Sequence, residues 1–180
     1  MHLNNWRDDL NKSRSNFVKV VWPKIKYWFG EFTELIQVEE IQDSYAELLD
    51  KEAGIDYLIK DKTGIRPLSA RVQSDNFLYK TVTIREKRAN GTKTEFQKLL
   101  TRVNSNYLHP WLHIQAYVQA GCLFAAFGVK IEDLIHILDF ENPEVWYRQT
   151  NKQDGNIFIV YKISGLKDYG IKVIEFKNNL

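Results

Sequence analysis

The sequence has very little cysteine, since Cys122 is the only one in 180 residues. A single cysteine cannot form an internal disulfide, and it excludes a zinc site built from paired cysteines. We therefore expect a protein of a reducing, cytoplasmic setting. We also predict that Cys122 is a buried and unreactive thiol.

Long apolar runs are missing as well, although 44% of the residues are hydrophobic and 13% are aromatic. No segment approaches the roughly 20 apolar residues that a membrane-spanning helix needs, so we expect no membrane partner. The nine glycines are dispersed and form neither a GxGxxG nor a Walker pattern, so no nucleotide cofactor is expected. The apolar residues suffice for the core of one domain and exclude global disorder.

The net charge is only +2, but the charges are segregated along the chain. Residues 31–56 carry nine acids and one lysine, a net charge of −8, whereas residues 71–102 carry eight bases and three acids, a net charge of +5. Such segregation is typical of a protein that meets phosphate on one face and holds a divalent cation on another. A solvent-exposed acidic helix face, balanced in space by bases, would produce the same pattern.

Four segments carry apolar residues at helical spacing and are predicted to contain helices: 16–41, 45–53, 94–103 and 132–140. Pro23 is expected to start a new helix or to kink the first one. Thr94 and Gln97 have the spacing of a capping box, which favours a helix beginning after Thr94.

Short runs rich in β-branched and aromatic residues are predicted to be strands: 55–60, 65–73, 77–87, 111–118, 123–131, 157–163 and 171–176. The order of helices and strands predicts one mixed α/β (α+β) domain over residues 1–180. Its N-terminal region, 1–53, is expected to be helical, and residues 54–180 are expected to form a sheet core with helices.

An acidic residue stands inside the first of these apolar strands. Asp56 comes just after the predicted acidic helix, and a buried carboxylate costs free energy unless it is paired or binds a metal. In the next strand Ser69, Arg71 and Gln73 alternate with other residues, so period-two spacing places them on one face. If the two strands form a hairpin, Asp56 can meet Arg71 and Gln73 at the same end of the sheet.

This layout resembles the PD-(D/E)XK nuclease superfamily, the fold of many restriction endonucleases and Holliday-junction resolvases. In that family an acidic helix precedes a strand whose Asp binds a divalent metal, and a turn leads to a strand bearing (D/E)-X-K. The resemblance covers roughly residues 34–118 and implies a restriction-endonuclease-like domain, with a central mixed sheet flanked by helices. By correspondence, Asp56 is the metal-binding acid, Arg71 stands at the acid position and Gln73 at the lysine position.

The resemblance implies a metal-dependent endonuclease that hydrolyses phosphodiester bonds in DNA with Mg²⁺ or Mn²⁺. Arg71 cannot bind a metal, so one of three preceding acids is expected to supply a further carboxylate: Glu47, Glu40 or Asp50. The expected catalytic residues are Asp56, Gln73, Arg71 and Glu47, and the expected metal ligands are Asp56, Glu47 and Glu40. Because a duplex requires two cuts, we expect a homodimer that associates through the N-terminal helices.

Basic residues accompany the third predicted strand and the turn after it. Arg85 is expected beside Arg71 in a neighbouring strand, where the two could grip a phosphate. The expected DNA-binding residues, which would contact the phosphate backbone, are Arg85, Lys87, Arg88, Lys93 and Lys98. An ordinary hairpin tip kept soluble by lysine and arginine would look the same.

Two other functions stay open at this stage. A catalytically inactive relative that kept the nuclease fold would act as a DNA-binding or protein-assembly module. A protein-interaction subunit, whose acidic and basic faces meet a partner protein, would have no affinity for nucleic acid.

Overall fold

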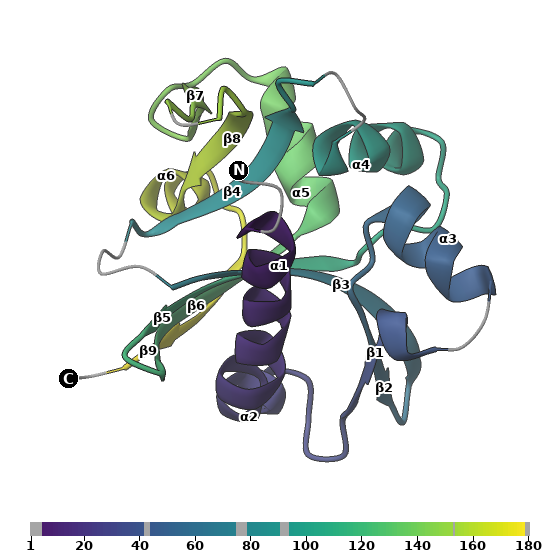
Figure 1. The fold of residues 1–180 in the computed structure, drawn as a ribbon. Coiled ribbons are helices and arrows are strands. Elements are labelled where there is room, and N and C mark those ends of the chain that lie inside the picture. Colours follow the sequence, from purple (N-terminus) through teal and green to yellow (C-terminus); the bar gives the residue numbers. More distant parts are fainter. Residues whose placement is uncertain (1–4, 42–43, 75–78, 91–93, 153, 179–180) are drawn as a thin grey trace.

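The protein contains two β-sheets with helices on their faces (Figure 1). The computed structural model describes residues 5–41, 44–74, 79–90, 94–152 and 154–178, without the side chains of residues 5–10, 44 and 47. The larger sheet has, in spatial order, strands β1 (Glu34–Gln37), β2 (Tyr57–Asp61), β3 (Gly64–Gln73), β5 (Leu112–Gln119), β6 (Cys122–Lys130) and β9 (Val173–Lys177). The smaller sheet has strands β4 (Thr81–Lys87), β8 (Ile157–Lys162) and β7 (Trp146–Thr150).

The larger sheet is mixed because one of its pairs is parallel. Strands β1, β2 and β3 form an antiparallel meander, and β5, β6 and β9 are also antiparallel. Strand β3 pairs in parallel with β5, from Leu68 opposite Leu112 to Gln73 opposite Tyr117. The crossover that this parallel pair requires contains β4 and helix α4 (Glu95–Asn104). The prediction of a mixed α/β fold is confirmed.

The N-terminal helices cover one face of the larger sheet. They are α1 (Asn5–Asn16), the π-helical segment η1 (Phe17–Val21), α2 (Trp22–Ile25) and the 3₁₀ segment η2 (Lys26–Trp28). Phe17 is buried and stacks on Tyr57 of β2, with ring centroids 4.5 Å apart. Pro23 lies in the first turn of α2, where the missing N–H has no intrahelical partner, so the predicted new helix start is confirmed.

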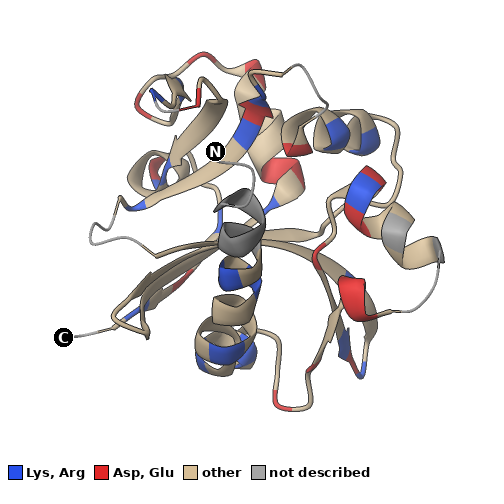
Figure 2. Ribbon diagram, in the orientation of Figure 1, with Lys and Arg blue, Asp and Glu red and all other residues tan. Residues whose placement is uncertain are grey.

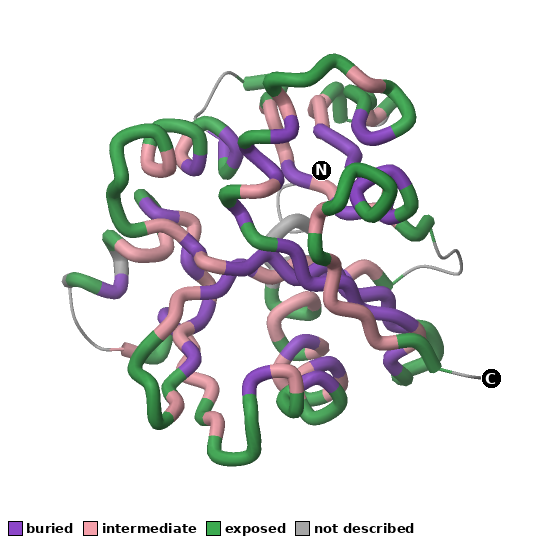
Figure 3. The backbone as a smooth tube through the Cα atoms, turned by 180° about the vertical axis from the view of Figure 1, so that it is seen from behind, coloured by how far each residue is buried: buried purple, intermediate pink, exposed green. Residues whose placement is uncertain are grey.

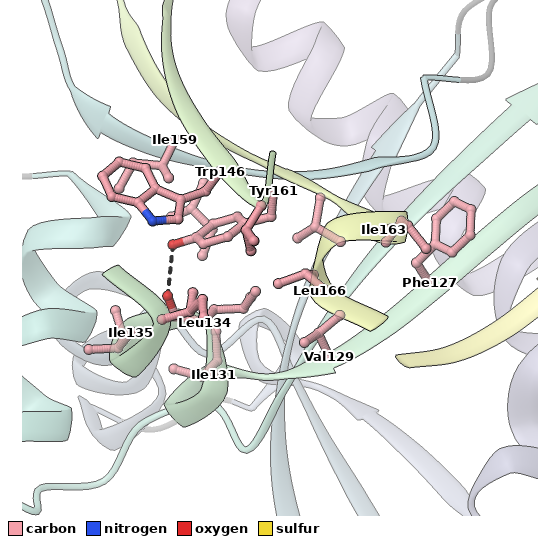
Figure 4. Close-up of a cluster of buried hydrophobic side chains, with 14 of the residues drawn as sticks. Phe127, Val129, Ile131, Leu134, Ile135, Trp146, Ile159, Tyr161, Ile163 and Leu166 are labelled. Carbon is pink, nitrogen blue, oxygen red and sulfur yellow. Dashed lines mark hydrogen bonds between the residues drawn. The ribbon is translucent and has the colours of Figure 1, made fainter. Parts of the chain in front are cut away.

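The other face of the larger sheet packs against a second hydrophobic core, which also contacts the smaller sheet (Figures 3 and 4). The helices beside it are α4, α5 (Ile131–His136) and α6 (Ile163–Asp168), and the 3₁₀ segment η4 (Ile137–Asp139) follows α5. The fully buried Tyr161 of β8 donates a hydrogen bond of 3.0 Å to the Leu134 carbonyl of α5 (Figure 4). Helix α3 (Ser44–Ala53) and the 3₁₀ segment η3 (Val38–Glu40) pack beside β1 and β2 around a third, smaller core.

Two sequence predictions are wrong at the level of elements. Leu35 and Ile36 follow the helical period but belong to β1, because pairing with β2 supplies their backbone hydrogen bonds; the N-terminal region is therefore not entirely helical. Cys122 is exposed at the start of β6, since it follows a tight turn rather than entering the core. Strand β7 and helix α6 were not expected, because each is short and its burial depends on tertiary neighbours.

Two elements beside the site are as predicted. The β2–β3 hairpin forms, and α4 begins with the predicted capping box between Thr94 and Gln97. None of the helices that the structure describes combines the length and the apolar character needed to cross a bilayer.

Candidate functional site

Asp56 lies at the point where β2 meets the edge of β3. The preceding helix α3 ends at Gly54, whose φ of +65° turns the chain toward the sheet. The Asp56 N–H donates to the Leu68 carbonyl (2.9 Å), and its Oδ2 accepts a hydrogen bond from the Ala70 N–H (2.8 Å). The carboxylate therefore binds the backbone of β3 at Ala70, one position before Arg71, rather than at Gln73.

The environment of Asp56 disfavours its charged form. Burial of the carboxyl group raises its pKa from 3.8 to about 7, against the opposing effect of the Ala70 hydrogen bond. The negative charges of Glu95 and Asp50 raise the pKa further. A carboxyl group with a pKa near neutral pH can either hold a proton or accept a cation in its place.

Glu95 is the acid that the sequence interpretation missed. It is the first residue of α4, and its charge influences both Asp56 and Arg71 more than any other charged side chain does. The sequence signal was available, because the predicted capping box at Thr94 places Glu95 in the first turn of a helix that returns to the sheet. A carboxylate that acts on Asp56 therefore comes from α4, after the motif, in addition to Asp50 of α3, before it.

Arg71 and Arg85 come from different sheets and meet at one aromatic ring. Their Cζ atoms lie 4.8 and 5.6 Å from the ring centroid of Phe158 in β8. The sequence analysis expected Arg85 in a strand next to β3. This prediction is wrong, because β4 pairs with β8 in the smaller sheet. The two guanidinium groups are nevertheless close enough for Arg85 to lower the pKa of Arg71, after the larger effect of burial.

Neither guanidinium group has an acid bonded to it in the part of the chain that the structure describes. The Nε atom of Arg85 is buried, and none of the described residues supplies a hydrogen-bond partner for it. Burial of an unpaired cation is unfavourable, whereas paired guanidinium groups suit a bidentate oxyanion. This arrangement is typical of a site that binds phosphate or carboxylate.

A chain of hydrogen bonds joins the two sheets beside this site. Gln115 of β5 is fully buried; its Nε2 donates to Gln73 Oε1 (3.2 Å), and its Oε1 accepts from the Thr83 hydroxyl (3.1 Å) and N–H (3.4 Å). Two residues further along β5, the Tyr117 hydroxyl donates to the Thr81 carbonyl (2.8 Å). The free edge of β4 is thus satisfied by side chains of β5.

Ser69 and His113 form a buried polar pair on the same face of the larger sheet. Ser69 Oγ lies 2.8 Å from His113 Nδ1, and His113 Nε2 is buried without a partner. Burial, with a smaller contribution from the charge of Arg71, lowers the pKa of His113 to about 3. The imidazole is therefore neutral at physiological pH and adds no charge beside Arg71.

Two of the three acids expected from the preceding segment accept hydrogen bonds from other side chains. Glu40 is exposed and accepts a hydrogen bond from Gln37, while Asp50 accepts one from Arg14 (3.2 Å). The side chain of Glu47 lies outside what the structure describes. Within the described residues, no group of three or more His, Cys, Asp or Glu side chains could hold a metal ion.

Three of the remaining predicted phosphate contacts, Lys87, Arg88 and Lys98, lie on or directly after β4 and on α4, two elements above the larger sheet in Figure 2. Lys87 is exposed at the end of β4, and the buried Nε of Arg88 has no hydrogen-bond partner among the described residues. Lys98 is partly exposed on α4, and Lys93 lies outside the described residues. Of the described residues, Lys87 shares β4 with Arg85, and Lys98 shares α4 with Glu95.

The chain matches no protein-family model, no curated protein and no solved structure. The chemistry of the site must therefore be inferred from its own geometry.

Proposed function

We propose that the protein is a divalent-metal-dependent endonuclease of the PD-(D/E)XK type, which hydrolyses phosphodiester bonds in DNA. The observation that carries the proposal is a pair of guanidinium groups, Arg71 and Arg85, that share the Phe158 ring and have no acid bonded to them within the described residues. The charge of Glu95 acts on both Arg71 and the buried carboxyl group of Asp56. The order of the elements also supports it, since an acidic helix, a hairpin, a further strand, a helix and a parallel strand follow one another as in that family.

The donor set fits Mg²⁺ or Mn²⁺. Carboxylate oxygens are the ligands these cations prefer, and Mg²⁺ is often bound by one or two carboxylates together with substrate phosphates. Asp56 and Glu95 would hold the cation. A cation bound there supplies Lewis-acid stabilisation of the phosphate and lowers the pKa of a water molecule.

The arginines provide the complementary part of the site. Arg71 and Arg85 would bind the non-bridging oxygens of the phosphate and offset the charge that builds up in the transition state. Phe158 keeps both guanidinium groups in place. Because the pKa of Asp56 is about 7, binding of a cation displaces a proton from its carboxyl group, so we expect metal affinity to rise between pH 6 and pH 8.

Plasmid cleavage in Mg²⁺ or Mn²⁺ tests the proposal. We expect nicked or linear products from the wild type and a loss of at least about 100-fold in rate for Asp56→Asn and for Glu95→Gln. Glu31→Gln is a matched control, because it removes an exposed acid far from the motif in sequence and should leave the rate unchanged. Full activity of Asp56→Asn or Glu95→Gln would overturn the assignment of these carboxylates.

A second candidate is phosphate-backbone binding without hydrolysis. It is favoured by the absence, within the described residues, of a group of three acidic or other metal-binding side chains. It predicts a gel shift with duplex DNA that weakens with salt and with Arg71→Gln or Arg85→Gln, but no cleavage in either metal. If the protein neither cleaves DNA nor shifts it at low salt, both candidates are excluded and a protein-interaction subunit is favoured.

The oligomeric state follows from the proposed reaction. Cutting both strands of a duplex requires two active sites, so we propose a homodimer as the active form. Sedimentation equilibrium of the wild type on a duplex oligonucleotide, in Ca²⁺ to prevent turnover, should give two protein chains per duplex; one chain per duplex would contradict this arrangement.

A further inference from the structure

The orientation of the Gln73 side-chain amide follows from an obligatory donor on another strand. The Thr83 backbone N–H can only donate, so the Gln115 atom that faces it is the oxygen, Oε1. The Thr83 hydroxyl donates to the same oxygen. The Nε2 of Gln115 is therefore the atom that faces Gln73.

Gln115 thereby determines which end of Gln73 is used internally. Its Nε2 can only donate, so Gln73 must present its own oxygen, Oε1, at 3.2 Å. Among the described residues, the Nε2 of Gln73 has no hydrogen-bond partner, and Gln73 is partly exposed. The half of the amide that remains available is thus an NH₂ group.

We propose that Gln115 is a positioning residue that fixes the amide of Gln73 with its NH₂ group free, as a donor to an anionic oxygen of the bound phosphate. This inference rests on the proposed function and deepens it. It assigns Gln73 to the same donor side of the site as Arg71 and Arg85, rather than to the cation, because its carbonyl oxygen faces Gln115.

The decisive variant is Gln115→Glu. In its ionised form the new carboxylate still accepts both hydrogen bonds from Thr83 but cannot donate to Gln73, so the comparison is made at a pH at which residue 115 is ionised. Gln73 must then turn its NH₂ group toward residue 115, and its carbonyl oxygen becomes the free atom. Replacing a donor by an acceptor opposite an anionic oxygen should weaken binding of a non-cleavable phosphorothioate duplex by about 10-fold or more.

A double-mutant cycle separates positioning from a merely structural role. In a Gln73→Met background residue 73 has no amide to orient, so Gln115→Glu should have little further effect on duplex affinity. An equal loss in both backgrounds would overturn the proposal. Gln119→Glu, the same change at an exposed position of β5, is the matched control and should leave affinity unchanged.

A ligand-free measurement makes the inference independent of the proposed function. In ¹⁵N-labelled Gln115→Glu protein, the Gln73 side-chain NH₂ protons should move downfield without any ligand, because they then donate to a carboxylate. Unchanged signals would overturn the assigned orientation, whereas a wild type that binds no duplex would overturn the proposed function alone. If Gln115→Glu fails to fold, Gln115→Met serves instead: its loss of duplex affinity should again disappear in the Gln73→Met background, and persistence there would contradict the proposal.

Discussion

Opposing effects act on the pKa of the Asp56 carboxyl group. Its Oδ2 satisfies the Ala70 N–H of β3, which no strand covers at that point, and this hydrogen bond favours the charged form. Burial and the charges of Glu95 and Asp50 favour the neutral form and prevail, so the pKa rises to about 7. An asparagine here could accept the same hydrogen bond from the Ala70 N–H without the cost of burying a charge.

We predict that Asp56→Asn stabilises the protein at high pH. The pKa of Asp56 is about 7 in the native state and 3.8 in the unfolded state, so ionisation lowers the free energy of unfolding. This loss of stability is fully present above about pH 7. The variant should therefore gain roughly 2–4 kcal/mol at pH 8. The gain should shrink as the pH falls from 7 to 4, because the native carboxyl group becomes protonated. Urea unfolding of both proteins at each pH measures the difference.

Asp61→Asn is a control of opposite sign. Hydrogen bonds from Thr63 and Arg66 lower the pKa of Asp61 to about 2, so its contribution to stability is present above about pH 4 and is lost as the pH falls through 2. The Asp61 variant should be less stable than the wild type at pH 8. Equal pH profiles for the two variants would contradict the assignment of Asp56 as a carboxyl group with a raised pKa.

At the scale of elements, short segments depend on close approach to their neighbours. Helix α6 has six residues, too few to be stable alone, and it packs against the chain that leads into β7. A Cβ atom at Gly165 would lie 2.2 Å from the Glu144 carbonyl oxygen and 2.7 Å from the Val145 Cα. Backbone atoms cannot move aside as a side chain can, so only glycine fits.

We predict that Gly165→Ala destabilises the protein by about 3 kcal/mol or more, the upper part of the range for overpacking. Helix propensity alone would predict the reverse, a gain of about 1 kcal/mol. Thermal unfolding followed by circular dichroism measures the effect, with Ser164→Ala as an exposed control on the same helix. A Gly165 variant as stable as the wild type would show that α6 and the segment before β7 are not in contact.

At the scale of the whole molecule, the candidate site exists because two sheets meet over it. Arg71 belongs to β3 in the larger sheet, whereas Arg85 and Phe158 form a cross-strand pair in the smaller one. Gln115 and Tyr117 satisfy the free edge of β4 and so keep the two sheets at a constant separation. Asp56, just before β2, and Glu95, the first residue of α4, are near enough for the charge of Glu95 to raise the pKa of Asp56.

We predict that Phe158→Leu weakens binding of duplex DNA by about 2- to 5-fold, since the ring contacts both guanidinium groups and such contacts are worth about 0.5–1 kcal/mol. Fluorescence anisotropy with a labelled duplex measures the affinity. Phe140→Leu makes the same change at an exposed ring and should bind as the wild type does. Unchanged affinity of the Phe158 variant would argue against the paired arginines as the phosphate contact.

Local sequence patterns were enough to predict the start of α4 and the residues that share one face of β3. Period-two alternation correctly placed Ser69 and Gln73 on the face of β3 that bears Arg71, and the capping box at Thr94 located the start of α4. These features depend on residues that are close in sequence, so backbone geometry alone determines them.

Only the tertiary structure decided which distant groups meet. The helical period failed at Leu35, because pairing with β2 outweighs local preference, and Arg85 lies in a separate sheet from Arg71. Glu95, nearly 40 residues from Asp56, reaches the site only because the parallel β3–β5 pair requires a crossover that carries α4 back over the sheet. The scarcity of cysteine excluded disulfide and paired-cysteine zinc chemistry from the start, whereas the meeting of carboxylates and arginines required long-range packing, which no local pattern encodes.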